Sequence, residues 1–363
     1  MSEWGTVALG EILTLKYGRA LKNGDRKGGP VPVVGSSGIV GWHDASIVDK
    51  STLVIGRKGS IGSLTLTEGA SWPIDTAYYA DFDPEIVDLR WLAHQLAGFD
   101  LKLLNKAAAV PGLNRDDVYR LHTVLPPLTE QRRIASILDE VDAIRAKRRD
   151  QLTHLDELPQ SLLHTIITST AASEPLGDIA SFVRGVTYKP TEVSMSGIGI
   201  MRTKNIQRRL DLSDIVRITP TKPIKNEKFL QEGDTLISSA NSWNLVGKCS
   251  FVDELAEDLA IGGFVTALRP SDRVNPTYLY QWFNSAPIQQ KVRSFGNKTT
   301  NISNLDMKRT VTLQVPLPSL RLQEEFADQV TAICIERDRV ERALEADEEL
   351  FAALQHRAFR GAL

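Results

Sequence analysis

The stretch "LPPLTEQRRIASILDEVDAI", Leu125 to Ile144, returns in weaker form as "VPLPSLRLQEEFADQVTAI", Val315 to Ile333. A displacement of 192 positions aligns Gln131 with Gln323 and still holds at His164, whose counterpart is also a histidine. One constant displacement across more than thirty residues leaves no gap between the copies. An internal repeat therefore organises the chain, and a fold assignment has to start from it.

Both copies continue as long segments in which apolar residues follow each other at alternating steps of four and three, the spacing of a helix that packs on another helix. About 34 residues at ~1.5 Å each span roughly 50 Å, more than a typical globular helix. We expect two length-matched helices packed on each other; two amphipathic core helices of separate domains are the alternative. The apolar seam comprises Ile134, Leu138, Val141, Leu152, Leu155 and Leu162 in the first copy, interrupted by Arg145, Arg148 and Pro159, and Phe326, Val330, Ile333, Val340, Leu344, Phe351 and Leu354 in the second, interrupted by Arg337 and Asp347.

One seam position differs sharply between the copies, because Pro159 lies where the second copy has Phe351. A proline inside a helix removes a backbone hydrogen bond and kinks or ends the helix. The sequence predicts a bend or break within a turn of Leu158, with residues 160–167 continuing as a short helix.

The segments between the helices also correspond, with landmarks such as "LGEI" at Leu9 and "LGDI" at Leu176. Short β-rich runs separated by Gly, Pro, Asn and Asp turns, together with one amphipathic helix in each half, indicate α+β units. A chain of 363 residues also exceeds the usual size of a single domain. We expect globular units at 1–127 and 171–318 and long helical regions at 128–170 and 319–363, related as a pseudo-twofold internal repeat.

Composition narrows the class of protein. No apolar run approaches the roughly 20 residues of a membrane-spanning helix and the first residues lack a signal-peptide pattern, so we expect a cytoplasmic protein. A net charge of −2 argues against a surface that is basic all over. Residues 131–164 carry six basic and six acidic residues, and 323–363 carry five and ten. The net charges of these two segments are 0 and −5. The rest of the chain, which is mostly the globular units, therefore carries a net charge of +3.

Polar loops at matching places in the two halves are the candidate contact surfaces. "GRKGSIG", Gly56 to Gly62, follows a β-rich run but has neither P-loop nor dinucleotide-binding spacing. "SSANSWNLVGK", Ser238 to Lys248, stands at the matching place in the second half. Arg, Asn and Gln side chains suit base edges, whereas Lys and Ser suit phosphates. A solvated charged turn is the better interpretation of any single loop, but the joint pattern favours DNA. The candidate contacts are Arg57, Lys58, Ser60 and Lys106 in the first half, and Lys204, Asn205, Gln207, Arg208, Arg209, Asn241, Trp243, Asn244, Lys248, Lys298, Thr299 and Asn301 in the second.

Catalytic patterns are not evident in the sequence. "NPTY", Asn275 to Tyr278, resembles the tetrapeptide of amino-methyltransferases, but it has Thr where a second Pro is required and no glycine-rich cofactor loop precedes it. The six histidines are scattered without a triad partner, and Cys249 and Cys334 show no zinc-site spacing. We predict a chain without catalytic residues and without a bound metal.

The two copies of the Pro-rich motif, the ending "LQHRAFRGAL" and the loop "LVIGRKGSIG" resemble the specificity subunit of type I restriction-modification systems. The resemblance covers essentially the whole chain. It implies two target recognition domains, each reading one half of a split DNA sequence, held apart by two conserved antiparallel helices that set the spacer.

The same resemblance implies that chemistry belongs to partner subunits. Two methyltransferase subunits would use S-adenosylmethionine, two restriction subunits would use ATP and Mg, and this chain would bind no cofactor directly. The acidic second helix suits docking better than phosphate binding. The predicted docking residues are Glu130, Gln131, Arg132, Arg133, Gln323, Glu324 and Glu325; the second motif is degenerate, so the two junctions need not bind partners identically.

Three other interpretations remain open on the sequence alone. The chain could be a recognition subunit of another restriction-type system with the same layout, or a coiled-coil scaffold without DNA specificity. A single-chain methyltransferase or nuclease is the third, against which the missing cofactor loop argues.

Overall fold

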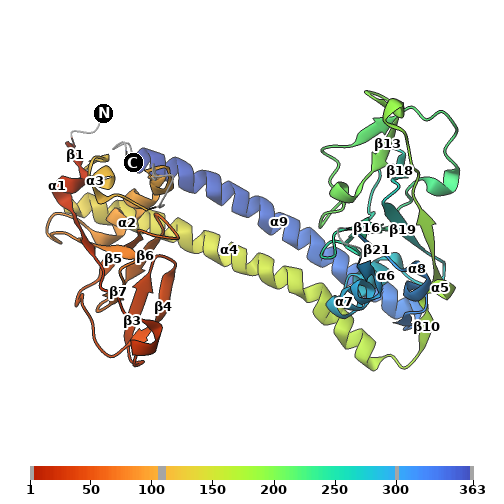
Figure 1. Ribbon diagram of the computed structural model, residues 1–363, viewed down its shortest axis with the longest axis horizontal. Coiled ribbons are helices and arrows are strands. Elements are labelled where there is room, and N and C mark those ends of the chain that lie inside the picture. Colours follow the sequence, from red (N-terminus) through yellow and green to blue (C-terminus); the bar gives the residue numbers. More distant parts are fainter. Residues whose placement is uncertain (1–3, 105–111, 299–301, 360–363) are drawn as a thin grey trace. The chain divides into compact units, whose positions relative to one another are not determined.

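The computed structural model describes residues 4–104, 112–298 and 302–359. The chain forms two compact units, unit 1 from Met1–Asp150 with Glu341–Leu363 and unit 2 from Gln151–Val340. Two long helices, α4 (Leu128–Ser169) and α9 (Leu320–Ala358), contribute one part to each unit (Figure 1). No helix in these described ranges is long and apolar enough to cross a membrane.

Unit 1 is built on an antiparallel sheet with the strand order β2-β8-β5-β6 and a smaller sheet with the order β4-β3-β7, in which β3 and β7 are parallel. Its strands are β1 (Thr6–Ala8), β2 (Thr14–Tyr17), β3 (Val31–Gly35), β4 (Gly38–His43), β5 (Thr52–Gly56), β6 (Leu64–Thr67), β7 (Trp72–Pro73), β8 (Ala77–Asp81) and β9 (His122–Val124); its helices are α1 (Leu9–Ile12), α2 (Leu89–Ala97), α3 (Arg115–Tyr119) and the short η1 (Asn23–Asp25) and η2 (Leu101–Leu104).

Unit 2 repeats this plan. Its main sheet has the order β11-β19-β15-β17, and a second sheet has the order β12-β14-β13-β18, with β13 and β18 parallel. The strands are β10 (Ser173–Pro175), β11 (Ala180–Arg184), β12 (Val193–Ser194), β13 (Ile198–Met201), β14 (Val216–Ile218), β15 (Thr235–Ser238), β16 (Ala240–Asn241), β17 (Cys249–Phe251), β18 (Leu259–Ile261), β19 (Val265–Pro270), β20 (Asn297–Lys298), β21 (Ser303–Asn304) and β22 (Gln314–Pro316); the helices are α5 (Leu176–Ile179), α6 (Pro276–Phe283), α7 (Ala286–Phe295), α8 (Met307–Thr310) and the short η3 (Pro190–Glu192), η4 (Thr203–Asn205) and η5 (Asn226–Lys228).

The expected α+β fold with an internal repeat is confirmed. The repeat landmarks are core positions, since Leu9 and Leu176 are both fully buried. Helices α2 and α6 also begin alike: Asp88 caps the first and Asn275 caps the second, each accepting two backbone N–H bonds with its side chain. Asn275 of "NPTY" is therefore a helix cap.

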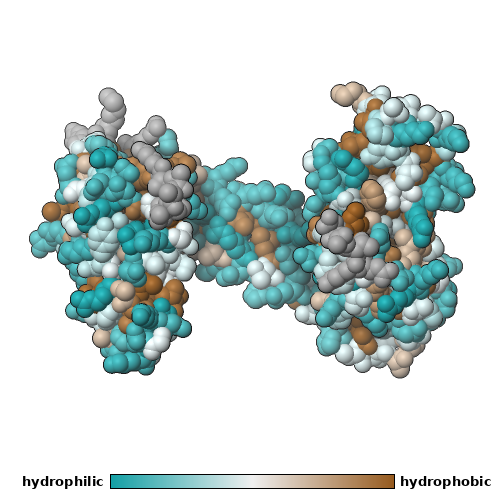
Figure 2. Space-filling model, viewed as in Figure 1, coloured by the Kyte–Doolittle hydropathy of each residue, from teal (hydrophilic) through white to brown (hydrophobic). Residues whose placement is uncertain are grey.

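Each unit has its own hydrophobic core, to which the long helices contribute. Ile134 and Leu138 of α4 pack with Trp91 in unit 1, and Phe326 and Val330 of α9 pack with Trp282 in unit 2. Burying each large apolar side chain stabilises the fold by about 1.5–3 kcal/mol, which fixes the helices to the sheets. Hydrophilic residues predominate on the visible face, where apolar residues form small separate patches (Figure 2).

The helix pair is confirmed, and the polar interruptions of its seam contact each other. In unit 1, Arg148 of α4 pairs with Asp347 of α9, and Arg145 lies 4.3 Å from the ring centroid of Phe351. Residue numbers rise along α4 as they fall along α9, so the helices run antiparallel there. In unit 2, Arg337 of α9 donates to Asp156 of α4 at 2.7 Å. Polar seam positions thus carry complementary charge instead of weakening the pair.

The helix does not break at Pro159, so that half of the expectation is wrong, while the expected bend stays a prediction. Helix α4 continues through Pro159 to Ser169, and the proline itself is buried. Leu162, Leu163 and Ile166, one turn further on, pack into the core of unit 2. Tertiary packing on both sides of the proline outweighs the one lost backbone hydrogen bond, so the local rule fails here.

Candidate nucleic-acid interface

The loop that follows β5 in unit 1 is closed by backbone bonds. Gly62 N donates to Gly56 O and Gly56 N donates to Ser63 O, both at 2.8 Å. Gly62 has φ +73°, and a Cβ at Gly56 would lie 2.1 Å from Ser60 O. Side chains are therefore excluded at these glycines, while Lys58 and Ser60 between them are exposed.

The matching loop of unit 2 has the same closure and more residues. Ser238 N donates to Lys248 O at 2.8 Å, and Gly247 N donates to Ser238 O at 2.9 Å, with Gly247 at φ +82°. Nine steps separate Ser238 from Gly247, against six from Gly56 to Gly62. The longer loop provides the room for Asn241 and its neighbours.

A second segment lies against this loop in each unit. Leu113 N donates to Arg57 O at 2.9 Å in unit 1, and Leu305 N donates to Ser239 O at 2.8 Å in unit 2. In unit 2 the contact extends into a three-stranded sheet with the order β16-β21-β20. The structure thereby joins the Ser238–Lys248 loop to β20, which contains the predicted contact Lys298.

The segment Arg202–Arg209, which contains the predicted contacts Lys204, Asn205, Gln207, Arg208 and Arg209, also contacts this loop. Lys248 Nζ donates to Gln207 Oε1 at 2.6 Å. Three segments that are distant in sequence thus lie together in unit 2. A single DNA-contact surface built from their polar side chains requires this proximity.

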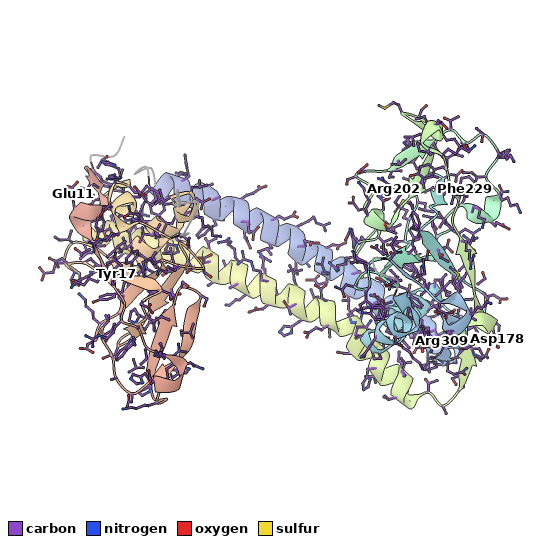
Figure 3. The ribbon with its side chains drawn as sticks, in the orientation of Figure 1. Glu11, Tyr17, Asp178, Arg202, Phe229 and Arg309 are labelled. Atoms are coloured by element: carbon purple, nitrogen blue, oxygen red, sulfur yellow. The ribbon has the colours of Figure 1, made fainter. Side chains whose placement is uncertain are left out.

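In unit 1, arginine and tyrosine side chains from separate segments lie together at the matching place. The Arg57 guanidinium lies 5.1 Å from the ring centroid of Tyr17 and 5.8 Å from that of Tyr78, and the Arg115 guanidinium lies 5.4 Å from that of Tyr17. Burial, followed by the contact with Tyr17, raises the pKa of Tyr78 to about 12. Tyr17 is 53% exposed and is labelled in Figure 3. Sequence reasoning missed Tyr17 and Arg115, because their proximity to Arg57 depends on the pairing of β2 with β8 and on α3.

The basic residues of Arg202–Arg209 are held by the protein's own carboxylates. Arg202, labelled in Figure 3, and Lys204 both pair with Asp214. Arg208 lies 3.1 Å from Asp156 of α4, and Arg209 lies 2.6 Å from Asp338 of α9. These pairs neutralise much of the loop's charge and tie the loop to both long helices within unit 2.

Asn205 is not on the surface. It is fully buried, its Oδ1 accepts from Arg202 N at 2.9 Å and its Nδ2 donates to Asp211 O at 2.8 Å. The side chain shapes the loop, so a direct base contact by Asn205 is ruled out in this conformation. Asn241 is partly engaged, accepting from Ser242 N at 2.8 Å and donating to Ser238 Oγ at 3.1 Å.

The other predicted contacts differ in exposure. Asn244 is exposed, and Trp243 is half-buried beside Gly296. Lys106, Thr299 and Asn301 lie outside the described residues, as does the side chain of Lys298. Within the described ranges, no group of three or more His, Cys, Asp or Glu residues could hold a metal ion.

Comparison with known proteins shows similarity to one family. Residues 1–154 match the family model of the type I restriction modification DNA specificity domain. This match covers less than half of the 363-residue chain.

Named specificity subunits are also similar in sequence to this chain. The StySPI specificity subunit of Salmonella potsdam is 26% identical over 48% of this chain and 38% of its own length, and the EcoKI specificity subunit of Escherichia coli is 22% identical over 52% and 41%. The chain thus spans less than half the length of these relatives. The EcoBI specificity subunit of Escherichia coli is 23% identical over 76% of this chain and 65% of its own length.

Solved structures share the fold. The S subunit of a type I restriction-modification system from M. genitalium has a TM-score of 0.63 at 17% identity, covering 98% of this chain and 96% of that chain. A second structure, described as showing complex assembly and conformational transition of the type I restriction-modification system, has a TM-score of 0.59 at 17% identity. It covers 99% of this chain and 98% of that chain.

Two of the residues predicted to dock partner subunits have another role in this structure. Gln131 and Gln323 are both fully buried. Gln131 Oε1 accepts from Asp88 N at 2.8 Å and its Nε2 donates to Pro126 O at 2.9 Å; Gln323 makes the same two bonds, with Asn275 N and Pro318 O. Each glutamine ties the start of a long helix to the cap of α2 or α6. Neither side chain can reach a partner, so the docking assignment of both is corrected.

The other motif residues are at the surface. Glu130 and Arg133 pair at 2.6 Å, which lowers the pKa of Glu130 and raises that of Arg133. Arg132 is exposed beside Asp88, at 3.8 Å. Glu324 and Glu325 are exposed on α9, and Arg321 donates to Glu325 at 2.9 Å.

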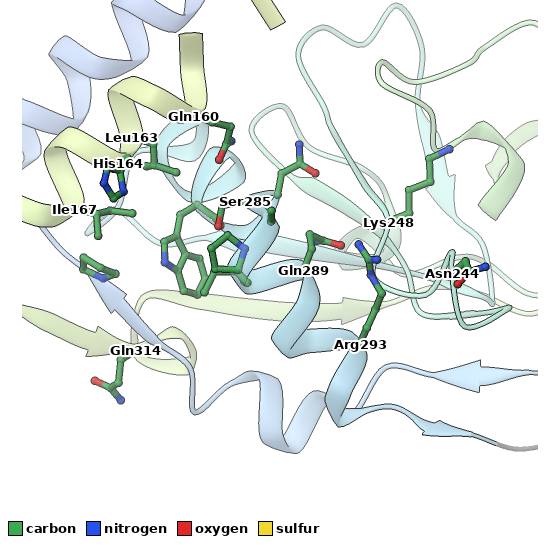
Figure 4. Close-up of a pocket in the computed structure, with 16 residues that line it drawn as sticks. Gln160, Leu163, His164, Ile167, Asn244, Lys248, Ser285, Gln289, Arg293 and Gln314 are labelled. Carbon is green, nitrogen blue, oxygen red and sulfur yellow. The ribbon is translucent and has the colours of Figure 1, made fainter. Parts of the chain in front are cut away.

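The repeat also extends to grooves beside the long helices. A cavity of 840 Å³ in unit 2 is lined by Gln160, His164 and Ile167 of α4, by the start of α7 and by Gln314 (Figure 4). A cavity of 390 Å³ in unit 1 is lined by Ala352, His356 and Phe359 and by His122. These four unit 1 residues and their unit 2 counterparts differ by 192 positions: 352 and 160, 356 and 164, 359 and 167, 122 and 314. The shared histidine lies in a groove in both units.

Proposed function

We propose that this chain is the DNA sequence-recognition subunit of a type I restriction-modification complex. Residues 1–127 and 171–318 would be the two target recognition domains, each reading one half of a bipartite asymmetric target. Residues 128–170 and 319–363 would be the conserved helical regions. Such a subunit would work in the cytoplasm with cellular DNA.

One observation carries the proposal: both units present a loop with identical backbone closure and different side chains. Gly62 and Gly247 close the two loops in the same way. The first loop presents Lys58 and the second Asn244. An identical scaffold with different contact groups is what two separate base sequences require, because base edges are read by side-chain donors and acceptors.

The ion pairs of the basic residues in Arg202–Arg209 limit the expected affinity of the isolated chain for DNA. Phosphate contacts supply most non-specific DNA binding, and cations already paired with carboxylates contribute less to it. The isolated chain would therefore bind DNA weakly, with strong selectivity arising once methyltransferase subunits are present.

The partners would provide the chemistry. Two methyltransferase subunits using S-adenosylmethionine and two restriction subunits using ATP and Mg would dock on the helical regions and their junctions. The docking candidates that remain are the partly exposed Glu130 and the exposed Arg132, Arg133, Glu324 and Glu325.

Helix length would set the spacer between half-sites. Helix α4 is unbroken across residue 151, where the two units divide. Inserting one turn in both α4 and α9 would add ~5.4 Å. We expect a changed spacer with unchanged half-sites, measured by sequencing methylated sites; an unchanged spacer would refute the ruler.

The decisive experiment is co-expression with the neighbouring methyltransferase, followed by mapping of methylated adenines. We expect one bipartite motif, and exchanging residues 1–127 for those of a relative should alter one half-site only. A matched exchange of 171–318 should alter the other. Absence of any bipartite motif, or equal binding to all duplexes, would favour a scaffold without DNA specificity. A bipartite motif with partners of different chemistry would favour another restriction-type system.

A further inference from the structure

Phe264 is an exposed aromatic residue at the turn between β18 and β19. Its side chain is 68% exposed, whereas Ile261 and Val265 on either side are at most 1% exposed. Leaving the apolar surface of an aromatic ring in contact with water is unfavourable. An exposed phenylalanine on a fixed turn therefore suggests a functional contact.

The backbone of this turn is fixed. Gly262 N donates to Met201 O at 2.9 Å, and Val265 N donates to Gly262 O at 2.9 Å. A Cβ at Gly262 would lie 2.4 Å from Met201 O, so only glycine fits there. Phe264 O accepts from Ser239 N at 3.0 Å. The ring is thus displayed from a rigid support.

The turn lies between two of the candidate contact loops. Met201 immediately precedes Arg202–Arg209, and Ser239 is the second residue of the Ser238–Lys248 loop that carries Asn244. Phe264 is therefore an apolar group flanked on both sides by polar loops of the candidate interface.

The corresponding residue of unit 1 is Thr76. Its carbonyl oxygen accepts from Arg57 N at 2.9 Å and from Lys58 N at 3.1 Å, as that of Phe264 does from Ser239 and Ala240. The Thr76 hydroxyl, however, accepts from Ser36 N at 3.3 Å and so belongs to the unit's own hydrogen bonding. The backbone clamp is common to both units, and only unit 2 uses it to display an aromatic ring.

We propose that Phe264 contacts the 5-methyl group of a thymine in the half-site read by unit 2. This inference rests on the proposed DNA recognition and names a further specificity-determining residue. Phenylalanine contacts the thymine methyl in the major groove, where an asparagine amide pairs with adenine. An A·T pair presents both groups on one edge, and the exposed Asn244 belongs to the loop whose Ser239 N donates to Phe264 O.

The test uses the complex with methyltransferase subunits and duplexes of the mapped target. Each thymine of the unit 2 half-site is replaced in turn by uracil, which removes only the methyl group. One replacement should weaken wild-type binding about fourfold, the value of one buried methyl group at ~0.8 kcal/mol. Phe264→Ala should weaken thymine binding similarly and show no further loss with uracil, whereas Phe264→Leu should keep part of the discrimination.

Met195→Ala is the matched control, because Met195 is a fully exposed apolar residue of unit 2 outside the three loops. It should leave every affinity unchanged. Retained thymine discrimination in Phe264→Ala, a half-site without thymine, or wild-type indifference to every uracil would overturn the inference while leaving selective binding intact. Loss of methyltransferase co-purification in Phe264→Ala with unaltered discrimination would also overturn it and would assign Phe264 to a protein interface. A wild-type complex without selective binding would refute the proposed function itself.

Discussion

Replacing Gln131 by methionine should destabilise unit 1 without affecting any docking surface. Methionine has nearly the same volume but no amide, so the change removes hydrogen bonds and leaves no cavity. Gln131 makes three of these: Asp88 N donates to it at 2.8 Å, and its Nε2 donates to Ile86 O and Pro126 O, both at 2.9 Å.

The magnitude follows from these bonds. At about 1 kcal/mol net for each buried hydrogen bond, Gln131→Met should lower the free energy of unfolding by roughly 3 kcal/mol. Gln323→Met removes the bonds with Asn275 N and Pro318 O, so we expect roughly 2 kcal/mol.

Urea unfolding of the full chain, followed by tryptophan fluorescence, measures the effect. Trp91 reports on the core of unit 1 and Trp282 on that of unit 2, so the two substitutions should shift different parts of the transition. Arg132→Met is the matched control at the adjacent exposed position and should change the stability by less than about 0.5 kcal/mol.

One result would refute the reasoning. If Gln131→Met leaves the unfolding free energy within about 0.5 kcal/mol of the wild-type value while methyltransferase subunits no longer co-purify, the glutamine is a docking residue and not a structural tie.

Three further changes test other parts of the structure. Asp156→Asn weakens the contacts of Asp156 with Arg208 and Arg337, and its carboxylate is 45% exposed. The unfolding free energy should fall by about 1 kcal/mol at low salt and by less at 1 M salt. An equal loss at both salt concentrations in urea unfolding would contradict an ionic origin. Burial raises the pKa of Cys249 to about 12, so below that pH the folded chain holds a neutral thiol; iodoacetamide at pH 8 should label it only after unfolding, and rapid labelling in the native state, mapped by mass spectrometry, would oppose this. Gly62→Ala places a Cβ at φ +73° and should destabilise unit 1 by about 1–3 kcal/mol, while Gly24→Ala, with open space around it, is the control; comparable urea midpoints for both variants would show that the loop closure is not strained.

Parts of the candidate interface were predictable because loops at corresponding strand ends must occupy corresponding places. The correspondence of "GRKGSIG" with Ser238–Lys248 follows from the repeat. That Arg208 and Arg209 would pair with helix carboxylates did not follow, since Asp156 and Asp338 are distant in sequence and an exposed helical carboxylate has no periodic signature. The same holds for Phe264, whose 68% exposure depends on a turn that Met201 and Ser239 hold in place.

The sequence by itself determined the helix pair and the doubled architecture, because apolar spacing and a constant displacement are local properties that survive without coordinates. The sequence also showed that Arg148 and Arg337 interrupt the apolar seams of the two helices. Tertiary structure alone decided what those positions do. It buried Gln131 and Gln323, paired the charges across the seam, and carried α4 through Pro159. Burial and pairing are set by neighbours from distant segments, and their summed packing free energy exceeds the local preferences that a sequence displays.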